Sequence, residues 1–472
     1  MSRRSKTPRT VENVLITGLA DKGRGVGRTS EGQVVFLEGT APGDVVDAVV
    51  KKKKDILEGE ATHFHTYSPD RVTPFCGHFG VCGGCKLQHI SYEGQLAAKD
   101  QIVHDALTRI GKVSVGTFEP IIGAEETRFY RNKLEFAFSN KRWLTYDELK
   151  SGISNQEDVL GFHRAGAFDK ILNIDTCYLM AEPMNAIRNA MRTIAIEQGL
   201  VFFDTKEQKG FLRQTMIRIT TLGDILLVVG FYKEHEYRRN NYLNAIAEQF
   251  PQITSLQYFI NGKGNDSFHG MDIKVHYGKP YIEEKLGDVT FRIGPHSFFQ
   301  TSTRQAERLF DTVKDFADFK GHENVYDLYT GLGSIALYVA KACKQVVAIE
   351  EIEEAIIDAR ANAELNSIDN CIFYAGDVKN ILTAEFAALH GKPDILITDP
   401  PRAGMHEKVV EMLLQLAAPK IVYVSCNPAT QARDLQLLSV KYDVQRSRAV
   451  DMFPYTHHIE NVALLTLKPE FV

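Results

Sequence analysis

The C-terminal third of the chain alternates helix-like and strand-like segments, and this order constrains its fold more than any other feature. From about Ser302 onward, helical runs such as TRQAERLFDTVKDFADF are followed by short apolar runs such as NVYDL, VVAIE, ILIT and KIVYV. Strands that are separated by helices form a mainly parallel sheet with helices on both faces, and such strands are apolar because both faces are buried. The pattern therefore predicts an α/β domain with a doubly wound sheet.

The first turn of this region has the features of a nucleotide site. The segment DLYTGLGS follows a strand and opens a helix, and its glycines allow a ligand to approach the backbone closely. The next strand ends at Glu350, where a carboxylate can accept hydrogen bonds from both hydroxyls of a ribose. Alternatively, Glu350 only stabilises the start of the next helix. Acidic residues at the ends of the two following strands, Asp377 and Asp399, favour a cofactor pocket, and the absence of a third glycine argues against a dinucleotide.

One cysteine stands where such a sheet performs chemistry. Cys426, in KIVYVSCNPAT, leaves a strand into a polar Asn-Pro turn at the edge that also carries the motif DPPRAG. A free cysteine is most often a small buried hydrophobic residue, and we interpret Cys343 and Cys371, within or beside apolar runs, in that way. The different context of Cys426 predicts a nucleophile.

A thiolate beside a methyl donor suits the methylation of carbon 5 of uracil. Addition of the thiolate to carbon 6 makes carbon 5 nucleophilic, and a base must later remove the carbon 5 proton so that the thiol can leave. The segment PYTHHIEN near the C-terminus offers three candidate bases, which are His457, His458 and Glu460. The residues by themselves do not choose among them.

The succession of acidic strand ends resembles the Rossmann-like class I methyltransferases. More specifically, DLYTGLG, DPPRAG, VSCNP and PYTHHIEN, in this order, resemble the RNA (uracil-5-)-methyltransferase family, which includes bacterial tRNA and 23S rRNA enzymes. The resemblance covers most of the chain. It implies S-adenosyl-L-methionine as methyl donor, Cys426 as nucleophile and Glu460 as base. It also implies that four residues contact the cofactor, namely Gln300, Tyr329, Glu350 and Asp399.

Two departures and two rival interpretations accompany this resemblance. Ser302 replaces the asparagine of the family's F-x-Q-x-N element, and Tyr329 stands where phenylalanine is frequent. Enzymes that methylate exocyclic amines also carry D-P-P, but an aromatic residue follows it there, whereas Arg402 follows here, and they do not need Cys426. An RNA-binding protein with a degenerate methyltransferase fold is disfavoured because nucleophile, base and cofactor carboxylates are all present.

A second group of cysteines has the spacing of a metal site. Cys76, Cys82 and Cys85 form C-x5-C-x2-C, and a fourth cysteine elsewhere would complete a four-thiolate site. Zinc ligands usually come in close pairs, so this spacing favours an iron–sulfur cluster over zinc without excluding His78 or His89 as ligands. The segment resembles the 23S rRNA branch of the family, which implies a structural [4Fe–4S] cluster with Cys177 as the fourth ligand. The tRNA branch lacks both this cluster and the N-terminal domain described next.

The N-terminal residues form a separate β-rich region. Between about Thr7 and His65, short alternating runs are separated by glycine-rich turns, which predicts a small closed barrel of the OB type. GLADKGRGVGR and GQVVFLEGTAPGD also resemble the TRAM domain, an RNA-binding module. A mixed α+β region follows. We therefore expect a TRAM domain over 1–66, a central iron–sulfur and RNA-binding domain over 67–294, and a methyltransferase domain over 295–472.

Charge and hydropathy bear on partners and location. The net charge of −5 over 472 residues does not indicate nucleic-acid binding, but a local run such as Lys51 to Lys54 can still contact phosphates. No apolar run reaches the roughly 20 residues that span a bilayer, so we expect a cytoplasmic protein without membrane contact or an obligate protein partner. The expected substrate is 23S rRNA, with tRNA as the alternative, at a uridine that can leave its stack.

Overall fold

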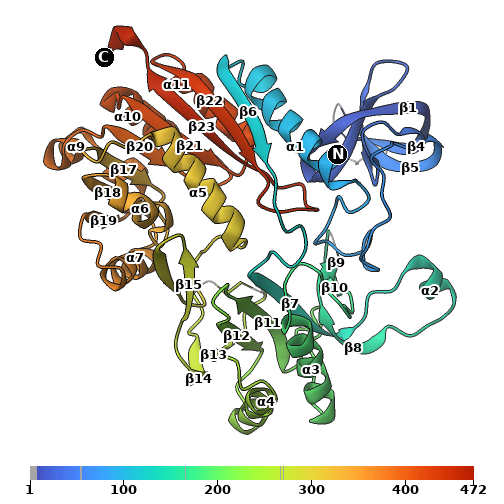
Figure 1. Cartoon of the computed structure of the whole chain (residues 1–472). Coiled ribbons are helices and arrows are strands. Elements are labelled where there is room, and N and C mark those ends of the chain that lie inside the picture. Colours follow the sequence, from blue (N-terminus) through green and yellow to red (C-terminus); the bar gives the residue numbers. More distant parts are fainter. Residues whose placement is uncertain (1–7, 54–55, 165, 266, 269, 472) are drawn as a thin grey trace, which may run out of the picture.

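A computed structural model describes residues 8–53, 56–164, 166–265, 267–268 and 270–471 (Figure 1). The N-terminal strands form a closed barrel in the order β1-β2-β3-β5-β4, as the glycine-separated runs predict. Its strands are β1 (Arg9–Ala20), β2 (Arg24–Arg28), β3 (Val34–Glu38), β4 (Val45–Lys53) and β5 (Ile56–Thr66). Gly59 permits the tight crossing of β5 and β4, because a Cβ there would lie 2.0 Å from the Val49 carbonyl oxygen. Lys51 to Lys53 lie on β4, whereas Lys54 lies outside the described residues.

The cysteine-rich segment leads into a helix and a strand that join the C-terminal half of the chain. These are α1 (Tyr92–Asp105), continued by one π-helical turn (Ala106–Ile110), and β6 (Val115–Ile122). β6 pairs in parallel with β22 at the edge of the C-terminal sheet. From the sequence we expect β6 in the central region, whereas the structure pairs it with the C-terminal sheet. The sequence does not indicate this, because a pairing between distant strands leaves no local signal. Helix α1 lies between the barrel and that sheet (Figure 1).

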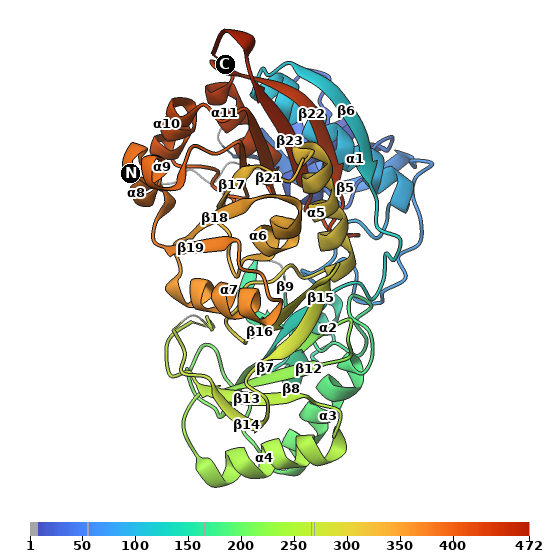
Figure 2. The ribbon, with the colours of Figure 1, turned by 60° about the vertical axis from the view of Figure 1, so that its left-hand side comes forward.

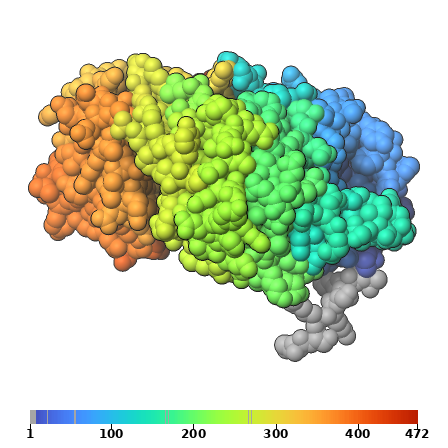
Figure 3. Space-filling view, turned by 90° about the horizontal axis from the view of Figure 1, so that it is seen from below, coloured from blue at the N-terminus to red at the C-terminus, as the bar shows by residue number. Residues whose placement is uncertain are grey.

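The central region is a six-stranded sheet in the order β14-β13-β12-β11-β7-β8. Apolar residues on one of its faces pack against α3 and α4, and those on the other face pack against the C-terminal domain. Figure 2 shows this region beside the C-terminal domain, with α4 at its far end, and Figure 3 shows it from below, in green to yellow, beside the orange C-terminal domain. Its elements are β7 (Lys133–Lys141), α2 (Tyr146–Lys150), β8 (Gln156–Gly161), β9 (His163–Arg164), β10 (Ala167–Ile171), α3 (Met184–Glu197), β11 (Leu212–Ile219), β12 (Ile225–Phe231), α4 (Glu236–Gln249), β13 (Ser255–Ile260) and β14 (Lys274–Gly278).

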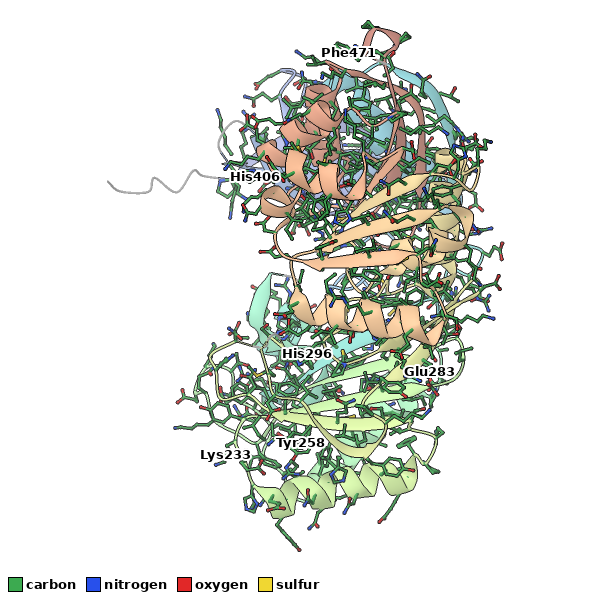
Figure 4. The ribbon with its side chains drawn as sticks, turned by 90° about the vertical axis from the view of Figure 1, so that its left-hand side faces the viewer. Lys233, Tyr258, Glu283, His296, His406 and Phe471 are labelled. Carbon is green, nitrogen blue, oxygen red and sulfur yellow. The ribbon has the colours of Figure 1, made fainter. Side chains whose placement is uncertain are left out.

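The hairpin of β15 (Ile282–Leu286) and β16 (Val289–Ile293) connects the central region to the C-terminal domain. In Figure 4, Tyr258 lies on the central sheet and His406 on the C-terminal domain, while His296 lies at the junction between them, near α7. Ser297 at this junction donates a hydrogen bond from Oγ to Oδ2 of Asp358 on α7, at 2.7 Å. This bond holds the start of the C-terminal domain against α7, and the two domains are joined by the apolar contacts described above as well as by the chain.

The C-terminal domain contains the predicted doubly wound sheet, in the order β19-β18-β17-β20-β21-β23-β22-β6. Its five strands from β19 to β21 are parallel, and β23 pairs antiparallel with both β21 and β22. Its elements are α5 (Thr303–Ala317), β17 (Asn324–Leu328), α6 (Ser334–Val339), β18 (Gln345–Glu350), α7 (Glu353–Leu365), β19 (Cys371–Ala375), α8 (Val378–Ile381), α9 (Ala384–His390), β20 (Ile395–Thr398), α10 (Glu407–Leu416), β21 (Lys420–Ser425), α11 (Pro428–Leu438), β22 (Tyr442–Val450) and β23 (Glu460–Leu467).

Alternate residues of each strand enter the cores on the two faces of this sheet. Val422, for example, packs with α5 and α7 on one face, and Tyr423 packs with α10 and α11 on the other. Burial on both faces explains why the strands are apolar throughout. No described helix combines the length and the apolar character that crossing a membrane requires.

Candidate functional site

The carboxyl ends of β17, β18 and β20 place the glycine-rich turn and two of the predicted acidic residues at one edge of the sheet. Oε2 of Glu350 accepts a hydrogen bond from the backbone N–H of Gly331 at 2.9 Å, and Oε1 accepts one from Ile352 at 3.1 Å. Gly331 has a φ of 59° and no atom within 4 Å of the place that a Cβ would occupy. The turn is therefore an open cradle beside a fixed carboxylate, which fits a nucleoside ligand.

The two acidic residues on either side of this cradle differ in environment. Asp377 caps α8 by accepting from the Lys379 N–H, and it forms an ion pair with the Lys379 ammonium group. Asp399 is half-buried, and desolvation together with the charge of Asp327 raises its pKa to about 7. Asp327 is buried, with its pKa raised to about 7 by burial. Two neighbouring carboxyl groups with raised pKa values therefore disfavour a double negative charge there.

Asn132, directly before β7 of the central domain, fixes the segment that carries Gln300. Its Nδ2 donates to the Gln300 carbonyl oxygen at 2.9 Å, and its backbone N–H donates to the Thr301 carbonyl oxygen at 2.8 Å. Ser302, which departs from the family pattern, is buried at the start of α5 and makes no side-chain cap to that helix. The sequence pattern does not single out Asn132, because its partners lie about 170 residues away along the chain.

Cys426 follows β21 directly and is partly exposed. Burial and then the charges of Glu460 and Asp399 raise the pKa of its thiol to about 11, while the guanidinium group of Arg402 acts in the opposite direction. A thiol in this environment is protonated at neutral pH. Arg402 is the cation that favours its thiolate.

Glu460 and His458 differ in how well their pKa values suit a general base. Glu460 begins β23 and is 6% exposed, and burial and the charge of Asp399 raise its pKa well above the usual range of a carboxyl. Burial and the charge of His457 lower the pKa of His458 to about 4, and its Nδ1 lies 3.2 Å from Arg402. A base works best with a pKa near the working pH, so Glu460 is better suited than His458.

A groove of about 1120 Å³ leads from the N-terminal barrel to Cys426. Arg402, Asn427, His457 and His458 line its inner end, α1 lines its length, and residues of β1, β2 and β3 line its outer end. The groove connects the barrel to the nucleophile without a break. The sequence did not indicate that α1 would form one of its walls.

The three closely spaced cysteines and the distant Cys177 come together around one small cavity of about 30 Å³. Cys76, Cys82, Cys85 and Cys177 all line it, together with His78. Burial raises the pKa of Cys85 to about 12 and that of Cys177 to about 11. Among the described residues, no three His, Cys, Asp or Glu side chains stand close enough to hold a single metal ion. The histidines have other partners, since His78 Nε2 accepts from the Asp175 N–H and His89 Nε2 contacts the Thr40 carbonyl oxygen.

Comparison with known sequences gives two family matches. Residues 219–468 match the family described as tRNA (Uracil-5-)-methyltransferase, and residues 5–62 match the TRAM domain. The chain is 48% identical over 455 residues to an uncharacterized RNA methyltransferase of Bacteroides thetaiotaomicron, with 95% of this chain and 100% of that protein aligned. It is 49% identical over 464 residues to one from Porphyromonas gingivalis, with 96% and 100% aligned.

A solved structure is similar over nearly the whole chain. This is the Pyrococcus abyssi tRNA (uracil-54, C5)-methyltransferase in complex with S-adenosyl-L-homocysteine, with a TM-score of 0.75 and 28% identity. The similarity covers 96% of this chain and 99% of that one. It therefore extends over the barrel, the central region and the C-terminal domain together.

Proposed function

Because the chain belongs to the tRNA (uracil-5-)-methyltransferase family and carries a TRAM domain, we propose that it methylates carbon 5 of a specific uridine in 23S rRNA. The family acts on RNA and uses S-adenosylmethionine as the methyl donor. The observation that carries the proposal is the position of Cys426 beside Glu460, on the sheet whose β17 and β18 ends carry the cradle of Gly331 and Glu350.

In the proposed reaction, the thiolate of Cys426 forms a bond to carbon 6 of uracil, which makes carbon 5 nucleophilic. S-adenosylmethionine, when bound, would supply the methyl group to carbon 5 and leave as S-adenosylhomocysteine, its methyl–sulfur bond broken. Glu460 then removes the carbon 5 proton, the C5–C6 double bond re-forms, and the bond from carbon 6 to sulfur breaks to release Cys426. Arg402 stabilises the thiolate before the addition and after the elimination, since it opposes the rise of the Cys426 pKa.

Four residues are proposed to hold the methyl donor. Glu350 would accept from the ribose hydroxyls, because its carboxylate is already fixed at the end of β18. Tyr329, with a φ of 66°, precedes the open turn at Gly331 and would offer an aromatic surface. Gln300 and Asp399 complete the proposed set, and the Asn132 contacts to the Gln300 segment support its position.

The four cysteines are proposed to hold a [4Fe–4S] cluster with a structural role. A single zinc ion would need its four sulfur atoms about 3.8 Å apart, given a zinc–sulfur distance of about 2.3 Å. In a cluster each thiolate binds a different iron atom, so the sulfur atoms surround a cavity instead. The four cysteines around one cavity fit the second arrangement.

The choice of RNA rests on the N-terminal half of the chain. The four cysteines resemble the 23S rRNA branch of the family, which supports 23S rRNA. The barrel does not discriminate, because the similarity to a tRNA enzyme extends over it, contrary to the expectation that the tRNA branch lacks this domain. The alternative is a tRNA uridine, and the similarity to the Pyrococcus abyssi tRNA (uracil-54, C5)-methyltransferase favours it. Methylation of an exocyclic amine is a weaker candidate, because that reaction has no use for Cys426.

The groove of about 1120 Å³ from the barrel to Cys426 is proposed to hold the RNA strand whose target base has left its stack. Mapping of 5-methyluridine in 23S rRNA and in tRNA from a deletion strain tests the proposal directly. Loss of one 5-methyluridine from 23S rRNA supports it. Loss confined to tRNA establishes the alternative, and loss from neither RNA refutes both.

A further inference from the structure

Lys99 and Asp451 form a buried ion pair that the proposed reaction does not use. The Nζ of Lys99 lies 2.6 Å from Oδ1 of Asp451, and the two side chains are 1% and 0% exposed. Burial of two charges is costly, and it is tolerated only with good geometry and further hydrogen bonds. Lys99 makes one such bond, to the Phe453 carbonyl oxygen at 3.2 Å. The pair joins α1 to a segment more than 350 residues away along the chain.

Two further residues on the same face of α1 reach the same segment. The Tyr92 hydroxyl donates to Oδ2 of Asp451 at 2.9 Å. Oε1 of Gln95 accepts from the Tyr455 backbone N–H at 2.9 Å. Positions 92, 95 and 99 share one face of a helix because they are three and four residues apart. All three side chains therefore hold one target.

That target is the connection 451–459, which we call the base loop because it ends directly before Glu460. It joins β22 to β23, and Tyr455 within it has a left-handed φ of 64°. The Tyr455 carbonyl oxygen also accepts from the N–H groups of Lys86 and Leu87, at 2.8 and 3.0 Å, directly after Cys85. The base loop is thus held from outside the C-terminal domain, by α1 and by the cysteine-rich segment.

The remaining surface of α1 faces the groove that leads to Cys426. Gly94, Ala97, Gln101 and Asp105 line that groove. One helix therefore contacts both the groove proposed for RNA and the loop that leads to the proposed base, and His457 and His458 of that loop line the groove as well. The position of α1 between the barrel and the C-terminal sheet is visible in Figure 1.

We propose that Tyr92, Gln95 and Lys99 are positioning residues, through which α1 sets the place of Glu460 for removal of the carbon 5 proton. This inference rests on the proposed function. A misplacement of about 1 Å can slow a chemical step about 100-fold, so small movements of the base loop matter. A merely structural ion pair would affect stability alone, whereas a positioning set affects one step of the reaction.

The test measures how fast the covalent protein–RNA intermediate forms and how fast it converts to methylated RNA. Undermethylated total RNA from a deletion strain is mixed with the protein and S-adenosylmethionine labelled in its methyl group, and the reaction is quenched in denaturant at short times. Label in a denaturant-stable protein–RNA complex reports the adduct at Cys426, and label in free RNA reports the product. For Gln95→Leu and Lys99→Met we expect conversion of adduct to product to slow about tenfold or more, with adduct formation changed much less.

Three further variants make the result decisive. Lys99→Met/Asp451→Asn removes both charges, so it avoids the unpaired buried carboxylate that would threaten folding of the single variant. It still lacks the bond to Phe453 and should show the same slow conversion. Glu93→Gln, at an exposed position of α1, should behave as the unaltered protein. Glu460→Gln should accumulate adduct.

Two kinds of result would contradict these proposals, one the positioning role and the other the proposed function. If Glu460→Gln accumulates adduct while the α1 variants convert theirs at the normal rate, or lose adduct and product together, the positioning role is wrong. If Glu460→Gln forms no adduct, the proposed function itself fails.

Discussion

Cys426 and Glu460 lie opposite each other at the ends of two antiparallel strands. Ser425 on β21 is paired with Asn461 on β23. Because the strands are antiparallel, Cys426, which follows Ser425, lies opposite Glu460, which precedes Asn461. The charge of Glu460 raises the pKa of the Cys426 thiol, after the larger effect of burial. The proposed nucleophile and the proposed base thus lie at the same edge of the sheet, as the proposed two-stage reaction requires.

Substitution of the nucleophile separates chemistry from cofactor binding. Cys426→Ala should abolish both methylated RNA and the covalent adduct, because no other thiol lines the inner end of the groove among the described residues. Calorimetric titration with S-adenosylhomocysteine should show unchanged affinity. Cys371→Ala, which alters a thiol of β19 away from the groove, is the matched control and should stay active. Methylation by Cys426→Ala would refute the covalent mechanism.

The pH dependence of adduct breakdown should report Glu460. A base must be deprotonated, and the pKa of Glu460 is raised well above the usual carboxyl range, so breakdown should slow as pH falls through that raised value. The expected acidic limb therefore lies at higher pH than for an ordinary glutamate. Single-turnover rates across pH measure it. Glu460→Gln should remove the limb and leave adduct behind. A limb at the pKa of an ordinary glutamate would contradict the burial argument.

Arg402 should control the formation of the adduct. Because Arg402 lowers the Cys426 pKa, Arg402→Gln should raise it further and move the rise of adduct formation to higher pH. Each pKa unit costs about tenfold in thiolate at neutral pH. Adduct formation at pH 7 should fall about tenfold and recover in alkali. A uniform loss at all pH values would indicate that Arg402 binds RNA instead.

Glu350 should be essential for binding the methyl donor. Removal of a charged hydrogen-bond acceptor costs about 1.5–3 kcal/mol, which is about a ten- to hundredfold loss of affinity. We expect this loss for S-adenosylhomocysteine in Glu350→Gln, measured by calorimetry. The neighbouring Glu351 is exposed, and Glu351→Gln should bind normally. Equal affinities in both variants would remove Glu350 from the proposed cofactor set.

The four-cysteine site should contain iron and sulfide. Protein purified without oxygen should be brown, with about four iron atoms per chain if one [4Fe–4S] cluster is bound. Cys82→Ser or Cys177→Ser should lower the iron content, whereas Cys343→Ser, in the core of the C-terminal domain, should not. Stoichiometric zinc in place of iron would overturn the assignment.

Much of the C-terminal domain follows from local sequence. Runs such as VVAI and ILIT are apolar throughout because helices cover both faces of the sheet, and this local character predicts the alternation of elements. The glycine-rich turn and Glu350 follow from the same reasoning, since the carboxyl ends of parallel strands meet at one edge. The closed barrel was also predictable, because its turns are marked by glycine.

The sequence by itself therefore determined the strand ends at which the candidate residues stand, since periodicity and turn residues are local properties. Only the tertiary structure decided which distant elements hold them. Lys99 looks like one polar residue of an amphipathic helix, and its burial against Asp451 depends on how α1 packs. Asn132 and β6 are similar cases, because a pairing across hundreds of residues is set by the total burial of the folded chain. Cys426 was visible in the sequence, and the contacts that hold its partner base were not.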